Sequence, residues 1–210
     1  MKNTFVFGHG VGTTSLAVRL LDRFLGSGRF AVRASQGWIY HLVANACQLI
    51  AVKIQESDRV TSVELQRHLD VAFDGVAVSK MEALVLRELG WSVNDVVPHT
   101  FIPSMLGAMA FVPGTREHDE AARRCDVFAL SVLYDAKFSA HATWPPSEIA
   151  AGIVAASLAD AGMHRDAVVR DLCRRVAVGA REDRVRACAI ELDAFREALG
   201  AARVNEHERR

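Results

Sequence analysis

Apolar residues recur at three- and four-residue spacing along nearly the whole chain, and strand-like alternation is almost absent. Glycine, proline, serine and threonine separate the apolar runs, as expected at helix ends. We therefore predict an all-α protein. The expected helices cover about residues 13–25, 37–56, 63–73, 79–89, a run opened by Pro98 that ends before Pro113, and then 115–137, 146–161, 165–176 and 181–199.

The length of 210 residues suits one large domain or two domains of about 100 residues each. The predicted helices fall into two sets of about five, joined near residues 94–98. We expect an N-terminal helical domain over residues 1–95, a second over 96–200 and a polar tail over 201–210. The helix at 37–56 has the most continuous apolar surface, which predicts a central place in its bundle.

Two lone charges interrupt apolar helices in the first half of the chain. Lys53 lies at the end of one predicted helix, and Glu82 lies inside the next strongly apolar helical run, 29 positions later. Such charges either pair with each other or bind a partner protein, and the residues alone leave both interpretations open. No nucleophile, metal site or phosphate-binding loop accompanies them, so the pattern does not indicate catalysis.

Composition narrows the function classes. Half of the residues are apolar and 24% are charged, which is typical of a globular protein and excludes disorder. Lys+Arg and Asp+Glu are both 25, so net charge gives no general reason to expect binding to nucleic acid or membrane. No C-x-x-C or H-E-x-x-H motif occurs, and we expect neither metal nor cofactor. The cysteines are isolated and predict buried free thiols in a reducing compartment: Cys47, Cys125, Cys173 and Cys188.

The start of the chain lacks the pattern of a secretory signal. The longest apolar run, Trp38–Val52, contains three polar residues and falls short of the roughly 20 residues that a bilayer requires. We expect a soluble intracellular protein, in the nucleus, the cytoplasm or both.

Three further features have structural interpretations. The glycine-rich segment 8–14 lacks the lysine of a phosphate-binding loop and predicts a turn with Thr13 or Thr14 as helix N-cap. Asp22 and Arg23 are neighbours in the apolar segment LLDRFL. We expect the Arg23 side chain to reach solvent and the Asp22 carboxylate to be buried against a cation, although no nearby basic residue is an obvious partner. The tryptophans lie at helix boundaries and are expected to anchor the core or a helix seam: Trp38, Trp91 and Trp144.

Five segments occur along the chain in one order: TSLAVRLLDRFL, ANACQLIAVKIQES, KMEALVLRELGW, PHTFIPSML and PPSEIAAGIVAASL. Together they resemble the cyclins over about residues 5–195, and the last two are most similar to D-type cyclins. The resemblance implies two tandem five-helix bundles. It also implies a non-catalytic regulatory subunit that binds and activates a cyclin-dependent serine/threonine kinase in cell-cycle progression, with kinase substrates or inhibitors as further partners.

The resemblance also implies which residues bind the kinase. In the family, a lysine and a glutamate at the positions of Lys53 and Glu82 bond the kinase backbone just ahead of its PSTAIRE-type helix. A helix-in-groove site of this kind combines apolar burial with charges that set the register. Leu42 matches a family core position, and Trp91 is expected to close the kinase-facing surface. The apolar pocket is implied to fall on Ile50, Ile54, Leu86 and Val93.

The chain departs from the family pattern at three points. The M-R-A-I-L motif of the first cyclin helix is not found, so we expect that helix to be missing together with the tryptophan and leucine of the substrate-docking patch. Asp22 matches the aspartate that normally pairs with the arginine of that motif, and is expected to lack its partner. Gln55 replaces the first acid of the usual K-x-E-E, and no L-x-C-x-E sequence is present.

Three other interpretations remain. A truncated or degenerate cyclin fold would have lost kinase activation. A transcription-type cyclin, similar to general initiation factors, would bind DNA and polymerase, and predicts a basic surface and a zinc ribbon that this neutral sequence lacks. A nucleotide-binding enzyme would use the glycine-rich segment and would need a lysine or acidic metal ligands nearby.

Overall fold

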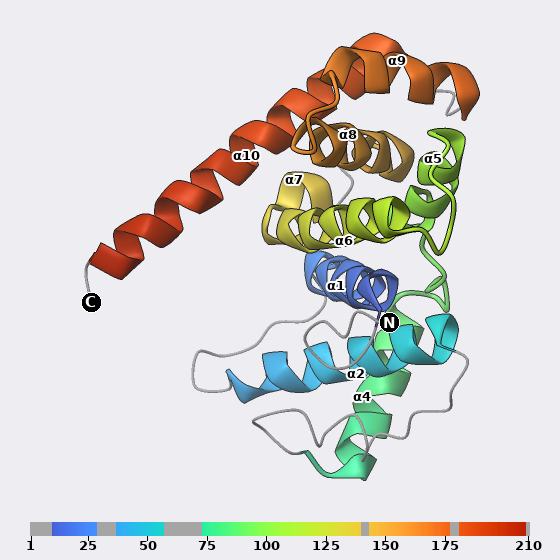
Figure 1. Cartoon of the computed structure of the whole chain (residues 1–210). Helices are drawn as coiled ribbons and strands as arrows, with labels where there is room; N and C mark the ends of the chain where they lie inside the picture. The colour runs from blue at the N-terminus through green and yellow to red at the C-terminus, as the bar shows by residue number, and fades with distance from the viewer. Residues whose placement is uncertain (1–9, 29–36, 57–72, 140–142, 177–180, 209–210) are drawn as a thin grey trace. The chain divides into compact units, whose positions relative to one another are not determined.

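The computed structural model describes residues 10–28, 37–56, 73–139, 143–176 and 181–208. All regular secondary structure in these ranges is helical, which confirms the all-α prediction (Figure 1). By its contacts the chain divides into two compact units, Met1–Val97 and Pro98–Arg210. The helix predicted over residues 63–73 lies outside the described residues except for Phe73. None of the described helices is both long and apolar enough to cross a membrane.

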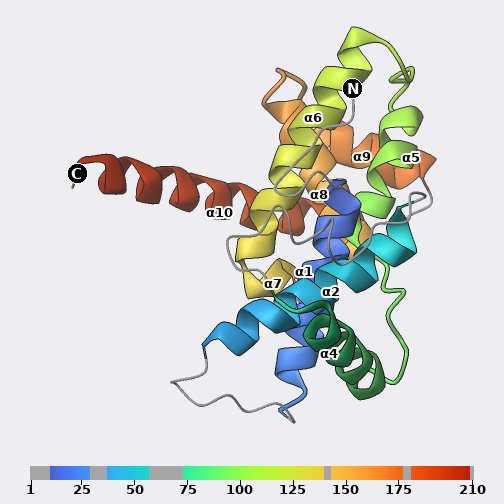
Figure 2. The ribbon, with the colours of Figure 1, turned by 90° about the horizontal axis from the view of Figure 1, so that it is seen from below.

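The first unit contains α1 (Val11–Gly26), α2 (Trp38–Gln55) and α4 (Gly75–Glu88). Helix α2 packs against both α1 and α4 (Figure 2). Ten of its eighteen residues are buried, as its apolar pattern predicts. The core of this unit includes Leu16, Leu20, Phe24, Val43, Ala46, Ile50 and Val85.

The second unit is built around α8 (Pro146–Ala159), which opens with proline at its first position and buries eleven of its fourteen residues. Helix α8 contacts α5, α6, α9 and α10. Among its large side chains, Ile149, Ile153 and Leu158 are almost fully buried. The other elements are η2 (Pro98–Thr100), α5 (Ile102–Ala108), α6 (Arg116–Ser131), η3 (Val132–Tyr134), α7 (Ala136–Ser139), α9 (Arg165–Arg175) and α10 (Glu182–Glu208).

Three predicted helices have clearly different limits in the structure. The helix expected over residues 79–89 begins four residues earlier, at Gly75 of α4. The single helix expected over residues 115–137 is divided into α6, η3 and α7, because the backbone is extended at Asp135 and its carboxylate accepts a hydrogen bond from the Lys137 amide at 2.8 Å. The last helix continues to Glu208, past the expected end at residue 199 and into the segment predicted as a polar tail.

The prediction that the tryptophans anchor the core or a helix seam is confirmed for Trp144 and wrong for Trp91, whereas Trp38 is outside the core but keeps a ring contact with Phe73. Trp144 is buried, its indole nitrogen donates to Glu191 at 3.2 Å, and the Arg184 guanidinium lies over its ring. Trp38 and Trp91 are 53% and 72% exposed. A helix boundary therefore places a large ring outside the core as readily as inside it.

The four cysteines are free, as predicted. Three of them are buried, and burial raises the pKa of each of these thiols to about 12: Cys47, Cys125 and Cys188. Cys173 is half-buried, and desolvation together with the charge of Glu182 raises the pKa of its thiol.

Candidate functional site

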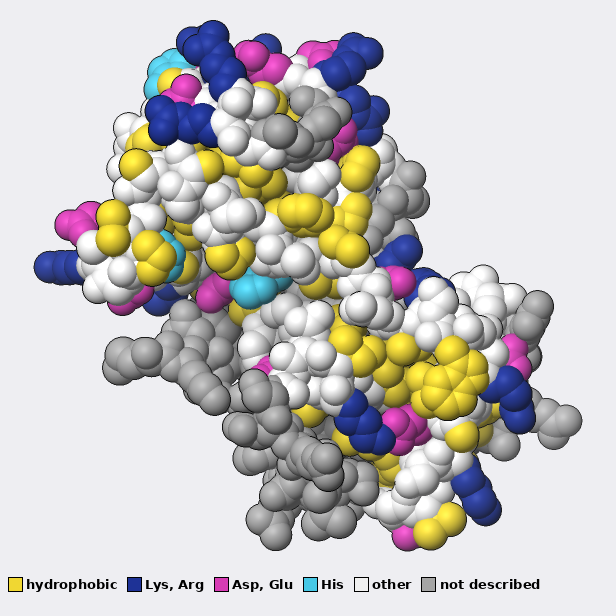
Figure 3. Space-filling view, turned by 90° about the vertical axis from the view of Figure 1, so that its right-hand side faces the viewer, with side chains coloured by type: hydrophobic (Ala, Val, Ile, Leu, Met, Phe, Trp, Pro, Cys, Tyr) yellow, Lys and Arg dark blue, Asp and Glu magenta, His cyan; other side chains and the backbone are white. Residues whose placement is uncertain are grey.

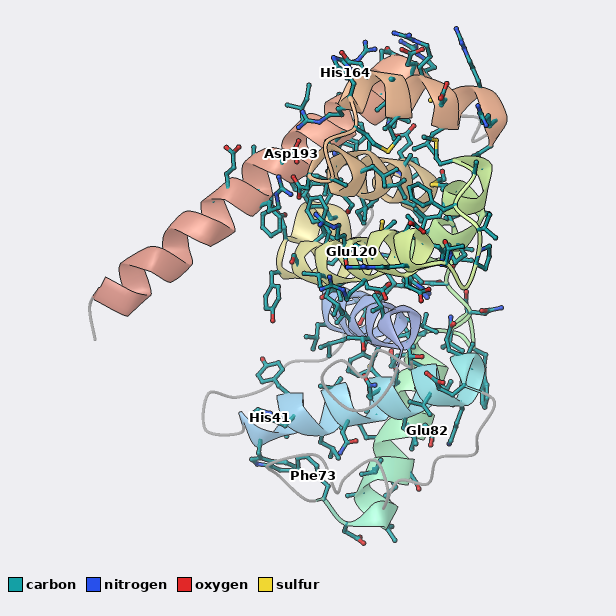
Figure 4. All side chains as sticks on the ribbon, viewed as in Figure 1. His41, Phe73, Glu82, Glu120, His164 and Asp193 are labelled. Atoms are coloured by element: carbon teal, nitrogen blue, oxygen red, sulfur yellow. The ribbon has the colours of Figure 1, made fainter. Side chains whose placement is uncertain are left out.

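The two lone charges of the first unit meet across α2 and α4. Lys53 lies in the last turn of α2, and its Nζ is 2.5 Å from Oε1 of Glu82. Figure 4 shows Glu82 on α4 near the C-terminal end of α2. Of the two interpretations that the sequence left open, pairing of the two charges is therefore found within the chain itself, and binding to a partner stays a prediction.

The pair is only partly shielded from water. The Lys53 side chain is 51% exposed and that of Glu82 14%. Exposed ion pairs contribute about 0–1 kcal/mol to stability, so a structural role alone explains little. An ammonium group has three donors, and a carboxylate accepts several hydrogen bonds. Lys53 and Glu82 can therefore keep their mutual contact and still bond the backbone of a second protein.

Apolar side chains lie close to both charges along the chain: Ile54 directly follows Lys53 on α2, Leu86 lies one turn after Glu82 on α4, and Val93 follows α4. Ile54 is 37% exposed, and Leu86 is half-buried. Val93 is also half-buried, and both Leu86 and Val93 pack against the core. Figure 3 shows hydrophobic side chains gathered on one face of this unit, next to adjoining basic and acidic groups.

One member of the predicted apolar pocket is not at the surface. Ile50 is 3% exposed and belongs to the core of the first unit. It lies one turn before Ile54 on α2, so it supports the surface from below. Leu42 is also buried, in a smaller cluster with Leu49 and Val78.

Trp91 extends the exposed apolar surface beyond the end of α4. Its amide donates to the Leu86 carbonyl at 2.8 Å, and its backbone has φ 60°, as does that of Gly90 before it. Left-handed backbone is common for glycine and unusual for a bulky residue. The chain thus turns back after α4 and leaves the indole in solvent.

Arg23 does not behave as predicted, and Asp22 departs from one of its two expectations, the lack of a partner. Asp22 is half-buried and has an interaction partner, so it is not the unpaired buried carboxylate expected. Arg23 does not extend freely into solvent, because its guanidinium donates to the Ser92 carbonyl at 2.6 Å and to both oxygens of Asp95 at 2.9 Å. Asp95 lies 72 residues away, and no local signal in the sequence links the two.

The glycine-rich segment ends at a helix N-terminus that binds a carboxylate of the same chain. Gly10, and not a threonine, is the N-cap of α1. The Gly10 amide donates to Glu56 Oε1 at 3.2 Å, and the Thr13 hydroxyl donates to the same oxygen at 2.7 Å. Glu56 therefore occupies the position that favours anions, where a nucleotide phosphate would have to displace it. In the described part of the chain, no three metal-binding side chains gather to hold an ion.

Comparison with known proteins relates this unit to one family. Residues 9–94 match the family model described as "Cyclin, N-terminal domain". Cyclin-D1-1 of Oryza sativa subsp. japonica is 29% identical over 192 residues, which cover 90% of this chain and 51% of that protein. Cyclin-D2-2 of the same organism is 32% identical over 146 residues, covering 69% of this chain and 39% of that protein. The chain thus spans about half or less of the length of these relatives.

A solved structure shares the fold. A viral cyclin from herpesvirus saimiri matches with a TM-score of 0.60 over 93% of this chain and 92% of that one, at 14% sequence identity. The prediction of a cyclin-like fold is thereby confirmed. Residues 9–94 match a cyclin N-terminal domain, and up to 90% of the chain is similar to D-type cyclins, as its sequence motifs indicate.

Proposed function

We propose that this chain is a regulatory subunit that binds and activates a cyclin-dependent protein kinase, and that the surface around Lys53 and Glu82 is its docking site. The observation that carries the proposal is the ion pair itself. It lies within a cyclin N-terminal domain, contributes little as an exposed bridge, and stands beside apolar side chains that are only partly buried.

The docking surface consists of two charges and an apolar set. Lys53 and Glu82 would bond the kinase backbone and fix its register, and the apolar side chains would gain burial on docking. An apolar centre with charges that become desolvated is typical of interface hot spots. The apolar set is Ile54, Leu86, Trp91 and Val93, with buried Ile50 as support.

The proposed action is allosteric. A ligand shifts a two-state equilibrium only by the difference in its affinity for the two states. The chain would bind the active placement of the kinase helix more tightly than the inactive one, and so bring a glutamate of the kinase to the lysine that holds ATP. All chemical steps would take place on the kinase.

Capture of cyclin-dependent kinases by the purified chain tests the docking site. We expect the wild-type chain to retain a kinase from a purified panel, and Lys53→Ala/Glu82→Ala to bind it at least about 10-fold more weakly, as for a hot spot. The exchange Lys53→Glu/Glu82→Lys keeps the internal attraction and reverses the charges offered to a partner. It should bind as weakly as the double alanine variant.

A matched control lies in the second unit. Arg186 and Asp166 form an ion pair between α10 and α9 at 3.0 Å, with both side chains partly exposed. Arg186→Ala/Asp166→Ala should bind the kinase like the wild type. The docking site is wrong if the charge exchange binds normally, or if no kinase is retained at all.

Phosphorylation assays test the regulatory role separately. Histone or retinoblastoma-peptide phosphorylation is expected only when the chain and a kinase are mixed, because the chain would supply no catalytic group. Activity of the chain alone would overturn this role. Binding without stimulation would leave a docking protein that does not activate.

A further inference from the structure

An ion-pair cluster joins α1 to the segment that follows α4. Arg23 donates to the Ser92 carbonyl at 2.6 Å and to both oxygens of Asp95 at 2.9 Å. Arg19, one turn earlier on α1, has its Nε 3.3 Å from Oδ2 of Asp95. We call Arg19, Arg23 and Asp95 the clasp.

The clasp is more sheltered than an ordinary surface ion pair. Its three side chains are between 21% and 25% exposed. Both guanidinium groups lie next to one carboxylate: Arg23 donates hydrogen bonds to it, and Arg19 Nε is within ion-pair distance. Charge-assisted hydrogen bonds such as those of Arg23 are short and directional. Arg23 also fixes a backbone carbonyl, which ties the main chain as well as the Asp95 side chain. The clasp therefore restrains the path of the segment after α4.

The restrained segment carries the unusual turn at Trp91. Gly90 and Trp91 both have φ 60°, and the Val93 amide donates to the Trp91 carbonyl at 3.1 Å. A bulky side chain on left-handed backbone persists only where its surroundings hold it. The indole itself contributes little to holding it, since it is 72% exposed. Contacts on the backbone side are therefore needed. The Trp91 and Ser92 amides donate to the Leu86 and Leu89 carbonyls at 2.8 and 3.1 Å, and the clasp adds further restraints at Ser92 and Asp95.

We propose that Arg23 and Asp95 are positioning residues that hold Trp91 and Val93 in place for kinase docking. This inference rests on the proposed function and adds residues outside the docking surface. A segment already fixed in its bound conformation loses less conformational freedom on association, so affinity rises without any new contact. The clasp thus strengthens docking through Trp91 without touching the partner.

Hydrogen exchange of the free chain tests the first step. Asp95→Asn keeps the size of the side chain and removes its charge. We expect the Trp91 and Val93 amides to exchange about 10-fold faster or more in this variant, and the amide of buried Val85 in α4 to be unchanged. General destabilisation would instead accelerate all three amides. Asp166→Asn removes a paired carboxylate in the second unit and should leave them unchanged.

A double-mutant cycle on kinase affinity tests the second step. Asp95→Asn should weaken kinase binding about 10-fold in the wild-type background and less than about 3-fold when Trp91→Ala is also present, because the clasp acts through Trp91. Arg23→Lys keeps the charge but loses the planar fork that reaches Ser92 and Asp95 together. It should give an intermediate loss, and it provides the same test if Asp95→Asn folds poorly.

The outcomes separate the two proposals. Equal losses of affinity with and without Trp91, or unchanged exchange at Trp91 and Val93, would overturn the positioning role while leaving kinase binding intact. Failure of the wild-type chain to bind any kinase would overturn the proposed function and the docking role of the clasp. The exchange measurement would then still decide whether the clasp orders this segment.

Discussion

Helices α4 and α8 have the same length of fourteen residues and opposite surroundings. Helix α8 buries eleven of its residues and is contacted by four other helices. Helix α4 buries only Val78 and Val85. The centre of the second unit is therefore specified by packing within the chain, whereas α4 keeps apolar and charged side chains in partial contact with solvent. Such partly exposed side chains are available to a partner.

A glutamate on each helix makes the same contrast. Glu148, in the first turn of α8, is 5% exposed and accepts three hydrogen bonds from Arg184, at 2.9, 3.1 and 2.9 Å. The side chain of Glu82 on α4 is 14% exposed and accepts one hydrogen bond from Lys53; the two basic partners, Lys53 and Arg184, are exposed to a similar extent, 51% and 44%. A buried carboxylate needs such partners, because its desolvation is costly. With fewer hydrogen bonds from its basic partner, the Glu82 carboxylate keeps acceptor capacity for contacts from outside.

Truncation of one leucine in each unit should give the largest expected difference in the free energy of unfolding between the two units. Leu192→Ala in α10 removes a fully buried side chain and should lower the free energy of unfolding by about 3 kcal/mol. Leu86→Ala on α4 should cost about 1 kcal/mol, because this side chain is only half-buried. Urea denaturation followed by circular dichroism measures both.

Leu86→Ala and Leu192→Ala should rank in the opposite order when kinase affinity is measured instead of stability. Leu86→Ala should weaken binding more than Leu192→Ala, measured at a temperature where both variants are folded. Leu192→Met, which keeps the volume, should be close to wild type in stability. An equal loss of stability for Leu86→Ala and Leu192→Ala would mean that α4 is packed as fully as the second core.

The close approach of α8 and α10 predicts the next largest effect. A Cβ atom added at Gly152 would lie 2.7 Å from Cδ1 of buried Leu192 and 3.4 Å from the Ala189 nitrogen. Gly152→Ala should therefore destabilise the chain by about 2 kcal/mol through overpacking. Gly107 in α5 has no atom within 4 Å of such a Cβ. Gly107→Ala is the matched control and should be neutral or stabilising by up to about 1 kcal/mol.

The sequence predicts best what depends on local pattern. The apolar run of α2 places this helix within one residue of its limits at each end, Trp38 and Gln55. The two lone charges, Lys53 and Glu82, were expected to pair or to bind a partner, and the pairing is found because helices packed side by side bring them together. Periodicity is thus sufficient for the fold class, and the lone charges point to the pair, whereas the binding role of the pair was implied only by the resemblance to the cyclins and stays a prediction.

Contacts between distant residues and backbone reversals could not be predicted. The partner of Arg23 is Asp95, and the group that binds the α1 N-terminus is Glu56; neither is adjacent in sequence. Its place at a helix boundary suggested that Trp91 anchors the core or a helix seam, but the ring lies in solvent after a turn with left-handed backbone. Ile50 faces inward because α2 is buried nearly all round, which a pocket inferred from resemblance alone does not reveal.

Substitution of Glu56 tests how much the first unit is stabilised by the one carboxylate that binds the N-terminus of α1. Glu56→Ala removes the acceptor of the Gly10 and Thr13 hydrogen bonds and should cost about 1 kcal/mol. Glu56→Gln keeps an acceptor oxygen without the charge and should cost less. Thermal unfolding measures both, with Gln55→Ala at the exposed neighbouring position as control. Equal stability of all three variants would show that the cap contributes nothing.

The smallest expected effect is the stability contributed by the Lys53–Glu82 pair. A double-mutant cycle with single and double alanine variants should give a coupling energy below about 1 kcal/mol that decreases with added salt. The same cycle on Arg184 and Glu148 should give a larger value that depends less on salt, because Glu148 is buried. A Lys53–Glu82 coupling as large as that of the buried pair would make the bridge a structural element and weaken the case for a docking site. A small coupling energy, together with a large loss of kinase affinity in the double alanine variant, would mean that the pair serves kinase binding and not stability.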